Sequence, residues 1–352
     1  MKILVAMSGG VDSSVTARLL TEAGHTCIGC TMKLYDNEDI GIPRFHTCCS
    51  LSDVEDARSV AYQLGMRYYV FNFSDDFCTK VIDKFVDSYR HGRTPNPCID
   101  CNRYMKFDKL FDRARLLGCD HVATGHYARI EFDGRKYRLK KAVDETKDQS
   151  YVLYTMTQDQ LAHTLFPLGT LHKTETRRIA EENNFINAAK PDSQDICFVP
   201  DGDYVHFIER YTGEKAQPGN FVDRAGNVLG QHHGIIGYTI GQRRVGLALS
   251  DRRYVCRICP EHNTVVLGAE SDLYRQDAEA VDFNWISGAP PERPIRCTVK
   301  TRYRQPEQEA EVVATGTQRV NIHFDRPQRA ITPGQAAVVY DGDVVLGGGM
   351  LV

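Results

Sequence analysis

The first two hundred residues alternate between short apolar runs and segments with helical spacing. Four apolar runs predict buried strands, and they cover residues 3–6, 26–34, 68–73 and 121–125. Helical spacing predicts helices over residues 15–23, 52–64 and 107–117. Because strands and helices alternate, we expect an α/β fold with a doubly wound parallel sheet, which binds ligands beyond the carboxyl ends of its strands.

The pattern changes after about residue 205, where helical periodicity fades and turns rich in Gly, Pro and Asp recur. From about residue 285 the runs alternate between apolar and polar positions, which predicts a small β-barrel. Its predicted strands cover residues 296–303, 309–314, 319–324 and 335–340. We therefore expect an α/β domain over 1–205, a small mixed central domain over 206–284 and a C-terminal barrel over 285–352. Asp133 and Gly134 predict a hairpin within the first domain.

Composition is that of an ordinary soluble protein, with 352 residues, 42% hydrophobic and 25% charged. No apolar run approaches the roughly 20 residues that a membrane span needs. The N-terminus is already a predicted strand and leaves no room for a signal peptide, so we expect a cytoplasmic protein without a membrane partner. Twelve cysteines in such a protein favour thiol chemistry, metal binding or burial over a disulfide scaffold.

The formal net charge of −3 gives no overall attraction to nucleic acid. Any binding of RNA then depends on local basic patches, whose phosphate contacts are electrostatic. Four such patches lie at residues 135–141, 243–244, 252–253 and 300–304, and two of them contain an interleaved tyrosine. Each patch alone is typical of a solvated face, and the four together shift the balance modestly toward RNA.

The segment 8–14 is a glycine-rich turn between a predicted strand and a predicted helix. Such a turn cradles phosphate, because glycine lets the backbone approach the ligand and the helix N-terminus offers N–H groups. The segment lacks the GK[ST] ending of the common mononucleotide loop. Asp12 is placed where it could help to hold Mg²⁺. The turn therefore suits binding of pyrophosphate while the α-phosphorus of a nucleotide is attacked.

The turn resembles the SGGxDS loop of the ATP pyrophosphatases, which adenylate a carbonyl oxygen and let a nucleophile displace AMP. Three further stretches, at 92–102, 147–151 and 191–198, and the run 123–127 resemble the tRNA-specific 2-thiouridylases. These enzymes replace the C2 oxygen of the wobble uridine of certain tRNAs with sulfur. The resemblance continues at 163–169, 241–246, 300–305 and 331–334, so it covers essentially the whole chain. It implies an ATP-pyrophosphatase domain, a central domain and a C-terminal β-barrel.

The resemblance also implies which residues bind the substrates. ATP is expected on the loop and on two residues beyond it, which together are Ala6, Met7, Ser8, Gly9, Gly10, Val11, Asp12, Ser13, Met32 and Gly125. The tRNA is expected on Asn96, Pro97, Cys98, Lys147, Asp148, Gln149, Arg302 and Tyr303. The first three of these would lie against the flipped uridine, since an enzyme that modifies a base must extract it from its stack. Met32 is otherwise a plausible core residue.

Thiolation of an amide-like carbonyl needs a leaving group on carbon, a sulfur carrier and a second thiol that releases the carrier. The resemblance assigns the carrier role to Cys197, which accepts a persulfide from a donor protein. Cys101 then resolves the intermediate, and the resulting Cys101–Cys197 disulfide is reopened by reductants. A buried structural role is the ordinary alternative for Cys197 taken alone.

Position 98 departs from the family, because many members have Asp where this chain has Cys98. Cys98, Cys101 and Cys197 could together hold a [4Fe–4S] cluster with one iron open for a sulfide. Sulfur transfer on such a cluster is therefore an alternative to the Cys197 persulfide. A more remote alternative is an amidotransferase or ligase of the ATP-pyrophosphatase type, which would leave the three cysteines unexplained.

The remaining cysteines and one histidine carry weaker hypotheses. Cys256 and Cys259 could join Cys98 and Cys101 in a zinc site, although alternation around residues 254–259 favours a strand. Cys48 and Cys49 precede a helix and are expected to pack or to line the active-site loop. His126 could act as a catalytic base, although a hydrogen-bonded loop histidine is the more ordinary interpretation.

Overall fold

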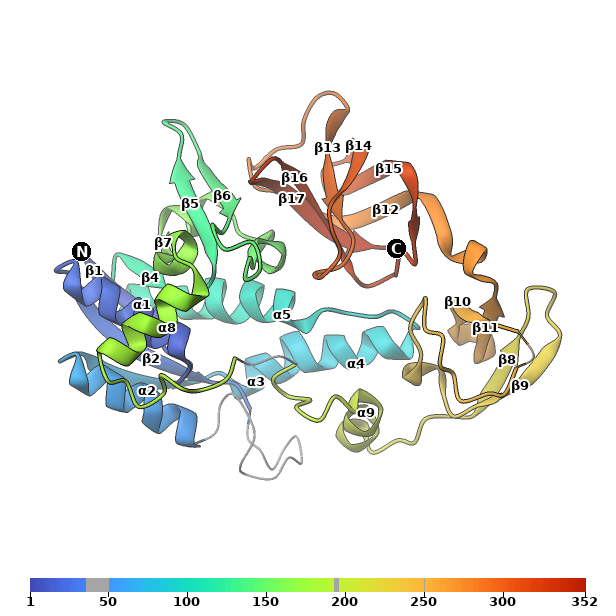
Figure 1. Ribbon diagram of the computed structural model, residues 1–352, viewed down its shortest axis with the longest axis horizontal. Coiled ribbons are helices and arrows are strands. Elements are labelled where there is room, and N and C mark those ends of the chain that lie inside the picture. Colours follow the sequence, from blue (N-terminus) through green and yellow to red (C-terminus); the bar gives the residue numbers. More distant parts are fainter. Residues whose placement is uncertain (36–50, 193–195, 250) are drawn as a thin grey trace.

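The computed structural model describes the whole chain except residues 36–50, 193–195 and 250. Figure 1 shows three parts: an α/β layer structure at the N-terminal end, a small four-stranded sheet, and a β-barrel at the C-terminal end. None of the helices in the described part of the chain is long and apolar enough to cross a membrane.

The N-terminal sheet is parallel and has the strand order β3-β2-β1-β4-β7. Its strands are β1 (Lys2–Ala6), β2 (Thr26–Lys33), β3 (Arg67–Asn72), β4 (His121–Ala123) and β7 (Thr164–Leu165). All four predicted strands are present. The strand order reverses between β1 and β4, so a crevice for a ligand is expected where these two strands end.

Helices cover both faces of this sheet, which confirms the doubly wound α/β fold. One face packs apolar side chains of α1 (Val11–Glu22), α2 (Leu51–Gln63) and α8 (Lys173–Glu182) against Ile3 and Val5. The other face packs α6 (Leu110–Leu116) against Leu4, Ile28 and Val122. Alternate residues of β1 thus serve opposite layers, as the period of a strand requires.

A chain of short helices leads from the sheet toward the other two domains (Figure 1). These elements are α3 (Ser74–Phe77), η1 (Cys78–Ile82), α4 (Asp83–Arg90), α5 (Pro97–Asp100) and η2 (Cys101–Lys109), which runs directly into α6. The predicted helix 107–117 is therefore the end of η2 followed by α6. Further short helices are η3 (Ser150–Leu153), α7 (Gln158–Ala162), η4 (Pro167–Thr170) and α9 (Tyr204–Thr212).

The central part is a four-stranded sheet with the order β10-β11-β8-β9. It contains β8 (Gly219–Val222), β9 (Val228–His232), β10 (Tyr254–Cys259) and β11 (Thr264–Gly268), with the short helices η5 (Ile235–Gly237), η6 (Pro260–His262) and η7 (Glu270–Leu273). Phe221, Val255, Val265 and Leu267 form its core.

The C-terminal part is a closed barrel, because its first strand pairs with its last. Its strands are β12 (Tyr274–Trp285), β13 (Ile295–Lys300), β14 (Gln308–Gly316), β15 (Arg319–Arg329), β16 (Ala336–Asp341) and β17 (Val344–Leu351). The pattern of residues predicted four of these strands, and it missed β12 and β17. Strand β12 lies in the segment 206–284 that was expected to be central, yet it pairs with β15 and β17 of the barrel.

The predicted hairpin at Asp133 is present as β5 (Ala128–Phe132) and β6 (Tyr137–Lys141). Strand β6 also pairs with β17 through Lys140 and Val344, so the hairpin extends the barrel sheet. Arg129 adds an ion pair with Asp343, at 2.7 Å. The hairpin therefore attaches the barrel to the α/β domain.

Candidate active site

The glycine-rich turn lies between β1 and α1, at the carboxyl edge of the sheet. Gly9 has φ = +76°, and a Cβ there would lie 2.3 Å from the backbone oxygen of Asp53. The side chain of Ser13 ties the turn together, since its Oγ donates to Gly10 O at 2.9 Å and accepts from Ser8 N at 3.2 Å. The close backbone contact and the positive φ both require glycine at position 9.

Gly125 follows β4 and packs directly on the start of α1. A Cβ on Gly125 would lie 2.9 Å from the carbonyl carbon of Asp12 and 3.0 Å from Ser13 N. The loop residue Gly125, predicted to bind ATP, therefore lies beside the phosphate turn. Met32 is near the end of β2 and packs against two of the apolar clusters, so its structure fits either a core or a nucleotide-contacting role.

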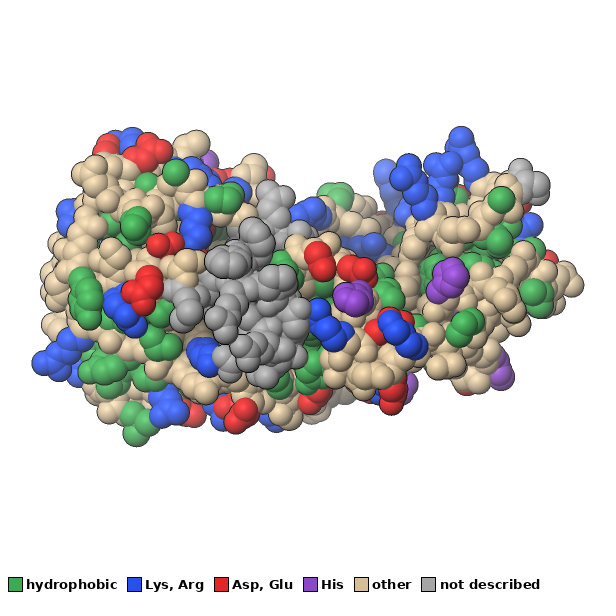
Figure 2. All heavy atoms as spheres, turned by 90° about the horizontal axis from the view of Figure 1, so that it is seen from below, with side chains coloured by type: hydrophobic (Ala, Val, Ile, Leu, Met, Phe, Trp, Pro, Cys, Tyr) green, Lys and Arg blue, Asp and Glu red, His purple; other side chains and the backbone are tan. Residues whose placement is uncertain are grey.

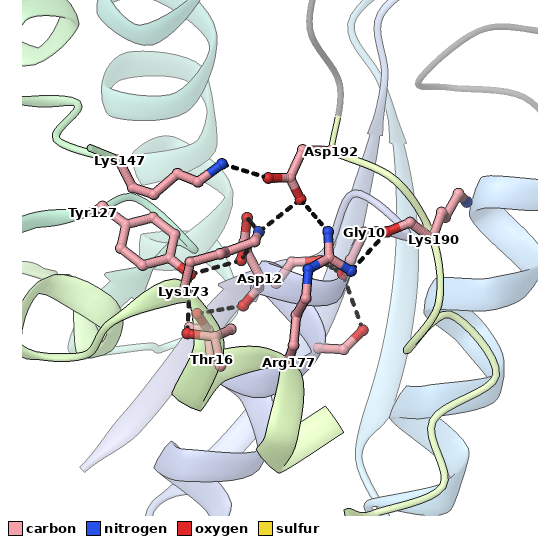
Figure 3. Close-up of polar contacts among 12 residues, drawn as sticks. Gly10, Asp12, Thr16, Tyr127, Lys147, Lys173, Arg177, Lys190 and Asp192 are labelled. Carbon is pink, nitrogen blue, oxygen red and sulfur yellow. Dashed lines mark hydrogen bonds and ion pairs between the residues drawn. The ribbon is translucent and has the colours of Figure 1, made fainter. Parts of the chain in front are cut away.

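Asp12 is neutralised by a lysine from the distant helix α8 (Figure 3). Lys173 Nζ lies 2.7 Å from one carboxylate oxygen of Asp12 and 2.8 Å from the other. The hydroxyl of Tyr127 also donates to Asp12, at 3.0 Å, and it lies 2.9 Å from Thr176 Oγ1. Burial and the charge of Asp12 raise the pKa of Tyr127, so this hydroxyl remains protonated as a donor.

Asp192 joins three cations beside the phosphate turn (Figure 3). Its carboxylate lies 2.8 Å from the side-chain nitrogens of Lys147, Lys173 and Arg177. Burial alone would raise the pKa of Asp192, but hydrogen bonds and charge from Lys147 and Lys173 outweigh it and hold the pKa at about 2. Two carboxylates and three cations thus meet where the phosphates of a nucleotide are expected.

A further lysine contacts the phosphate turn from the other side. Lys190 Nζ lies 3.3 Å from Gly9 O and 2.9 Å from a carboxylate oxygen of Asp56, and it also pairs with Asp53. Asn187 donates to Gly9 O at 2.9 Å from the same segment. The segment 187–190 is therefore anchored on the turn. Together these residues surround the turn with side chains that suit a polyphosphate.

The cysteine stretch begins with a capped helical turn. Asn96 is the N-cap of α5, and its side-chain oxygen accepts from Cys98 N at 3.2 Å. Cys98 is exposed, whereas Cys101 at the start of η2 is only partly exposed. Burial raises the pKa of the Cys101 thiol to about 11, and the positive charge of Lys106 opposes this rise. Cys101 forms no disulfide with any cysteine in the described part of the chain.

Cys101 and Cys197 lie against the same aromatic cluster, although they are distant in sequence. The cluster is built from Phe77, Phe85 and Phe198, among other buried apolar side chains, and both cysteines pack against it. Residues at the ends of β2 and β3 belong to the same cluster, so it lies at the carboxyl edge of the sheet. The hydroxyl of Tyr35 donates to the carbonyl of Cys197 at 2.8 Å and holds this segment on the cluster.

The three cysteines of the iron–sulfur hypothesis do not form a ligand set in this conformation. Among the residues that the structure describes, no three His, Cys, Asp or Glu side chains are grouped to hold a metal ion. No step of the reaction is therefore derived through a cluster, and Asp12 as a Mg²⁺ ligand stays a prediction.

The other cysteine hypotheses resolve differently. Cys256 and Cys259 lie in strand β10, and Cys256 Sγ lies 3.3 Å from Tyr254 O. The strand interpretation is thus confirmed. Cys48 and Cys49 lie outside the described residues. His126 is buried and hydrogen-bonded, with its Nδ1 2.6 Å from Thr124 Oγ1, as the loop-histidine interpretation predicts.

Two of the residues predicted to bind tRNA, Asp148 and Tyr303, meet at the contact between the α/β domain and the barrel. The hydroxyl of Tyr303 donates to Asp148 O at 3.1 Å, and Gln149 accepts from Tyr127 N at 3.0 Å. Arg302, by contrast, points inward. Its guanidinium donates to Ile240 O at 3.1 Å, to Ala330 O at 3.2 Å and to Thr332 Oγ1. Contact with tRNA stays a prediction for all of these residues.

Exposed basic side chains lie elsewhere on the molecule. Arg243, Arg244 and Arg252 are exposed on loops of the central part. Figure 2 shows Lys and Arg side chains gathered at the end of the molecule that carries this part. These residues are better placed than Arg302 to meet a phosphate backbone.

Four residues without a predicted role lie at the phosphate turn in the structure: Lys173, Arg177, Lys190 and Asp192. Lys173 and Asp12 are separated by 161 positions, so no local spacing connects them. The only available signal was the position of Asp192 within the stretch 191–198 that leads to Cys197.

The fold and the phosphate turn at the strand switch point define a nucleotide-binding α/β protein of the ATP-pyrophosphatase type. Three family models match the chain in series: the tRNA methyl transferase HUP domain over residues 1–201, the tRNA methyl transferase PRC-barrel domain over 205–269 and the aminomethyltransferase beta-barrel domain over 275–351. Curated relatives are named tRNA-specific 2-thiouridylase MnmA. The protein of Acetivibrio thermocellus is 50% identical over 99% of both chains, and that of Clostridioides difficile is 48% identical over 99% of this chain and 98% of its own.

The chain belongs to the tRNA-specific 2-thiouridylase family, whose members are tRNA sulfurtransferases. Among solved structures, a 4-thiouridine synthetase–RNA complex with bound ATP matches with a TM-score of 0.39 and 19% identity, over 56% of this chain and 45% of that chain. NMN synthetase from Francisella tularensis matches with a TM-score of 0.34 and 15% identity, over 61% and 78%. These two likenesses are too distant to bear on the function.

Proposed function

We propose that the protein uses ATP to replace the C2 oxygen of the wobble uridine, position 34 of tRNA, with sulfur. The observation that carries the proposal is the packing of Cys101 and Cys197 against one aromatic cluster, at the same sheet edge as the phosphate turn. A nucleotide site explains the phosphate turn alone. A thiolation reaction explains both the turn and the pair of thiols.

ATP activates the base in the first half of the reaction. The C2 oxygen of uridine attacks the α-phosphorus, an adenylated base forms and pyrophosphate leaves. The turn from Ser8 to Ser13 offers backbone N–H groups to the phosphates, and Lys173, Lys147 and Arg177 lie where they can take up the negative charge of pyrophosphate. Asp12 would hold Mg²⁺, which neutralises phosphate charge when it is bound.

Sulfur enters in the second half of the reaction. The terminal sulfur of a Cys197 persulfide attacks C2, and AMP leaves with the former C2 oxygen. The Cys101 thiolate then attacks Cys197 Sγ, so the sulfur–sulfur bond to the base breaks and its electron pair stays on the sulfur at C2. A Cys101–Cys197 disulfide remains, and an external dithiol reduces it by two electrons before the next turnover.

A persulfide donor protein supplies the sulfur in this scheme. The alternative in which a sulfide enters on an iron–sulfur cluster has no grouped ligand set among the described residues, so we do not adopt it. The amidotransferase or ligase alternative would need neither cysteine, and it predicts an enzyme that survives their removal.

The Cys197→Ser variant tests the proposal most selectively. We expect this variant to release pyrophosphate from ATP in the presence of tRNA and to form no 2-thiouridine. Cys259→Ser, at a buried cysteine of strand β10, is the matched control and should thiolate normally. Full thiolation by Cys197→Ser would refute the proposal. Release of pyrophosphate by the wild type that does not depend on tRNA would favour a ligase with another substrate.

A further inference from the structure

The helix that begins with Cys101 is wound more loosely than an α-helix. Its hydrogen bonds span five residues, as in the bond from Leu110 N to Met105 O at its C-terminal end. Residues five positions apart therefore lie on the same side of η2. Lys106 is the residue five positions after Cys101, so the winding turns this lysine toward the same side as the thiol. Such π-helical turns are rare and recur at functional sites.

A buried histidine fixes the position of this lysine. Lys106 Nζ lies 3.2 Å from His126 Nε2, and His126 Nδ1 lies 2.6 Å from Thr124 Oγ1. Burial first, and then the charge of Lys106, lower the pKa of His126 well below its usual range. The imidazole is therefore neutral, accepts from Lys106 at Nε2 and donates to Thr124 from Nδ1. The ring packs between Phe107 and Phe166, which leaves it a single orientation.

The positive charge of Lys106 has no carboxylate counterion among the described residues. No ion pair joins Lys106 to any acidic side chain in the part of the chain that the structure describes, whereas the nearby Lys109 pairs with Asp76 at 2.8 Å. Of the described side chains, Lys106, Cys98 and Asp100 act electrostatically on the Cys101 thiol, and among these three the lysine alone favours the thiolate. An immobilised cation near a partly buried thiol is the arrangement that activates a cysteine.

We propose that Lys106, held by His126, is the positioning residue that stabilises the anionic form of Cys101. The inference rests on the proposed function for its purpose, because Cys101 must be a thiolate to attack the Cys197 sulfur. It adds a residue outside the cysteine motif, and it gives His126 the role of orienting a cation. Gly125 connects this arrangement to the phosphate turn, since it lies between Thr124 and His126 and packs on the start of α1.

The test is the pH dependence of alkylation of Cys101 by iodoacetamide, followed by mass spectrometry of the peptide that contains it. Lys106→Gln removes the charge but keeps a donor for His126, and Lys106→Met is a second uncharged variant. At about pH 8 we expect alkylation of Cys101 to be slower by about threefold to tenfold in both, and the pH midpoint of the reaction to move upward. Lys106→Arg should restore the wild-type profile, and Lys109→Gln is the matched control.

Unchanged alkylation of Cys101 in a folded Lys106→Gln or Lys106→Met protein would overturn the inference. The assay uses neither tRNA nor ATP, so it separates the two proposals. If the Lys106 variants are alkylated more slowly but the wild type forms no 2-thiouridine, the proposed function alone is refuted. Normal thiolation by the wild type together with an unchanged alkylation profile in the variants would refute the role of Lys106 alone.

Discussion

Lys173 pairs with both carboxylate oxygens of Asp12, at 2.7 Å and 2.8 Å. The contact joins the start of α8 to the start of α1 and places a buried ammonium group beside the phosphate turn. Asp192 contacts the same ammonium group at 2.8 Å. A cation held by two carboxylates can turn toward pyrophosphate without being exposed to bulk water, where its charge would be screened.

Replacement of this lysine should impair activation of the base. In Lys173→Met we expect release of pyrophosphate to fall about a hundredfold, because a preorganised cation at the developing phosphate charge is lost. Arg178→Met, on the exposed side of the same helix, removes only an ion pair with Glu182 and should keep the wild-type rate. The rate is measured with tRNA in excess, after circular dichroism has shown that both variants fold. A wild-type rate in Lys173→Met would remove this residue from the nucleotide site.

Asn96 offers two separable functions, a helix cap and a contact with the base. Asn96→Ala removes the oxygen that caps α5 and should lower the free energy of unfolding by about 1 kcal/mol. Asn96→Asp keeps a capping oxygen but loses the amide donor that could contact the uracil edge. We expect Asn96→Asp to unfold like the wild type in urea and yet to thiolate tRNA poorly. Normal thiolation by Asn96→Asp would show that Asn96 is a cap and not a base contact.

Arg302 should be tested for stability as well as for tRNA binding. Its guanidinium donates to two backbone carbonyls and a threonine, and these contacts link the barrel to the central part. Arg302→Met leaves these acceptors without their donor, so we expect the free energy of unfolding to fall by about 2 kcal/mol. The neighbouring Arg304 is exposed, and Arg304→Met should unfold like the wild type.

Binding of tRNA at several salt concentrations separates the two roles of Arg302. If Arg302→Met lowers the free energy of unfolding more than it lowers the free energy of tRNA binding, Arg302 is a structural residue. If Arg302→Met is stable but the salt dependence of its tRNA binding constant is changed, Arg302 makes the phosphate contact that the resemblance implies.

Acid should weaken the Asp192 network in a defined pH range. The pKa of Asp192 is about 2 in the folded chain and near its ordinary value of 3.8 in the unfolded chain. Because the folded pKa is the lower of the two, the stabilisation is complete above about pH 4 and is lost as the pH falls toward 2. The free energy of unfolding in urea should therefore fall more steeply with acid in the wild type than in Asp192→Asn.

Asp108→Asn is the matched control for this prediction, because Asp108 is exposed. Its acid dependence should equal that of the wild type. Equal slopes for the wild type and Asp192→Asn would contradict the assignment of Asp192 as an ionised partner of the surrounding cations.

The α/β domain could be predicted from the sequence because its information is local. A buried strand such as β1 is a continuous apolar run. The turn that follows it needs glycine because its backbone must approach a phosphate closely, and this requirement is visible in the local sequence. The two barrel strands that were missed are less distinct. β17 contains Gly347, Gly348 and Gly349, which pack tightly against Phe283 and Tyr154 but carry no alternating pattern.

The charged part of the site could not be predicted in the same way. The partners of Asp12 and Asp192 come from α8 and from the segment around Lys147, and only the tertiary fold brings them together. For Arg302, the local sequence was misleading. Its place in a basic run suggested an exposed patch, yet the fold turns its guanidinium inward to satisfy backbone carbonyls, whereas Tyr303 beside it does lie at the junction with the α/β domain.

The most direct test of the account is analysis of the nucleosides of tRNA after incubation with the purified protein, ATP, Mg²⁺ and a persulfide donor. We expect 2-thiouridine at the wobble position, formed together with AMP and pyrophosphate, by protein that contains no iron. Formation of 2-thiouridine only by protein carrying about four iron atoms per chain, and its loss in Cys98→Ala, would contradict the persulfide mechanism. The absence of 2-thiouridine with every sulfur source would contradict the proposed function itself.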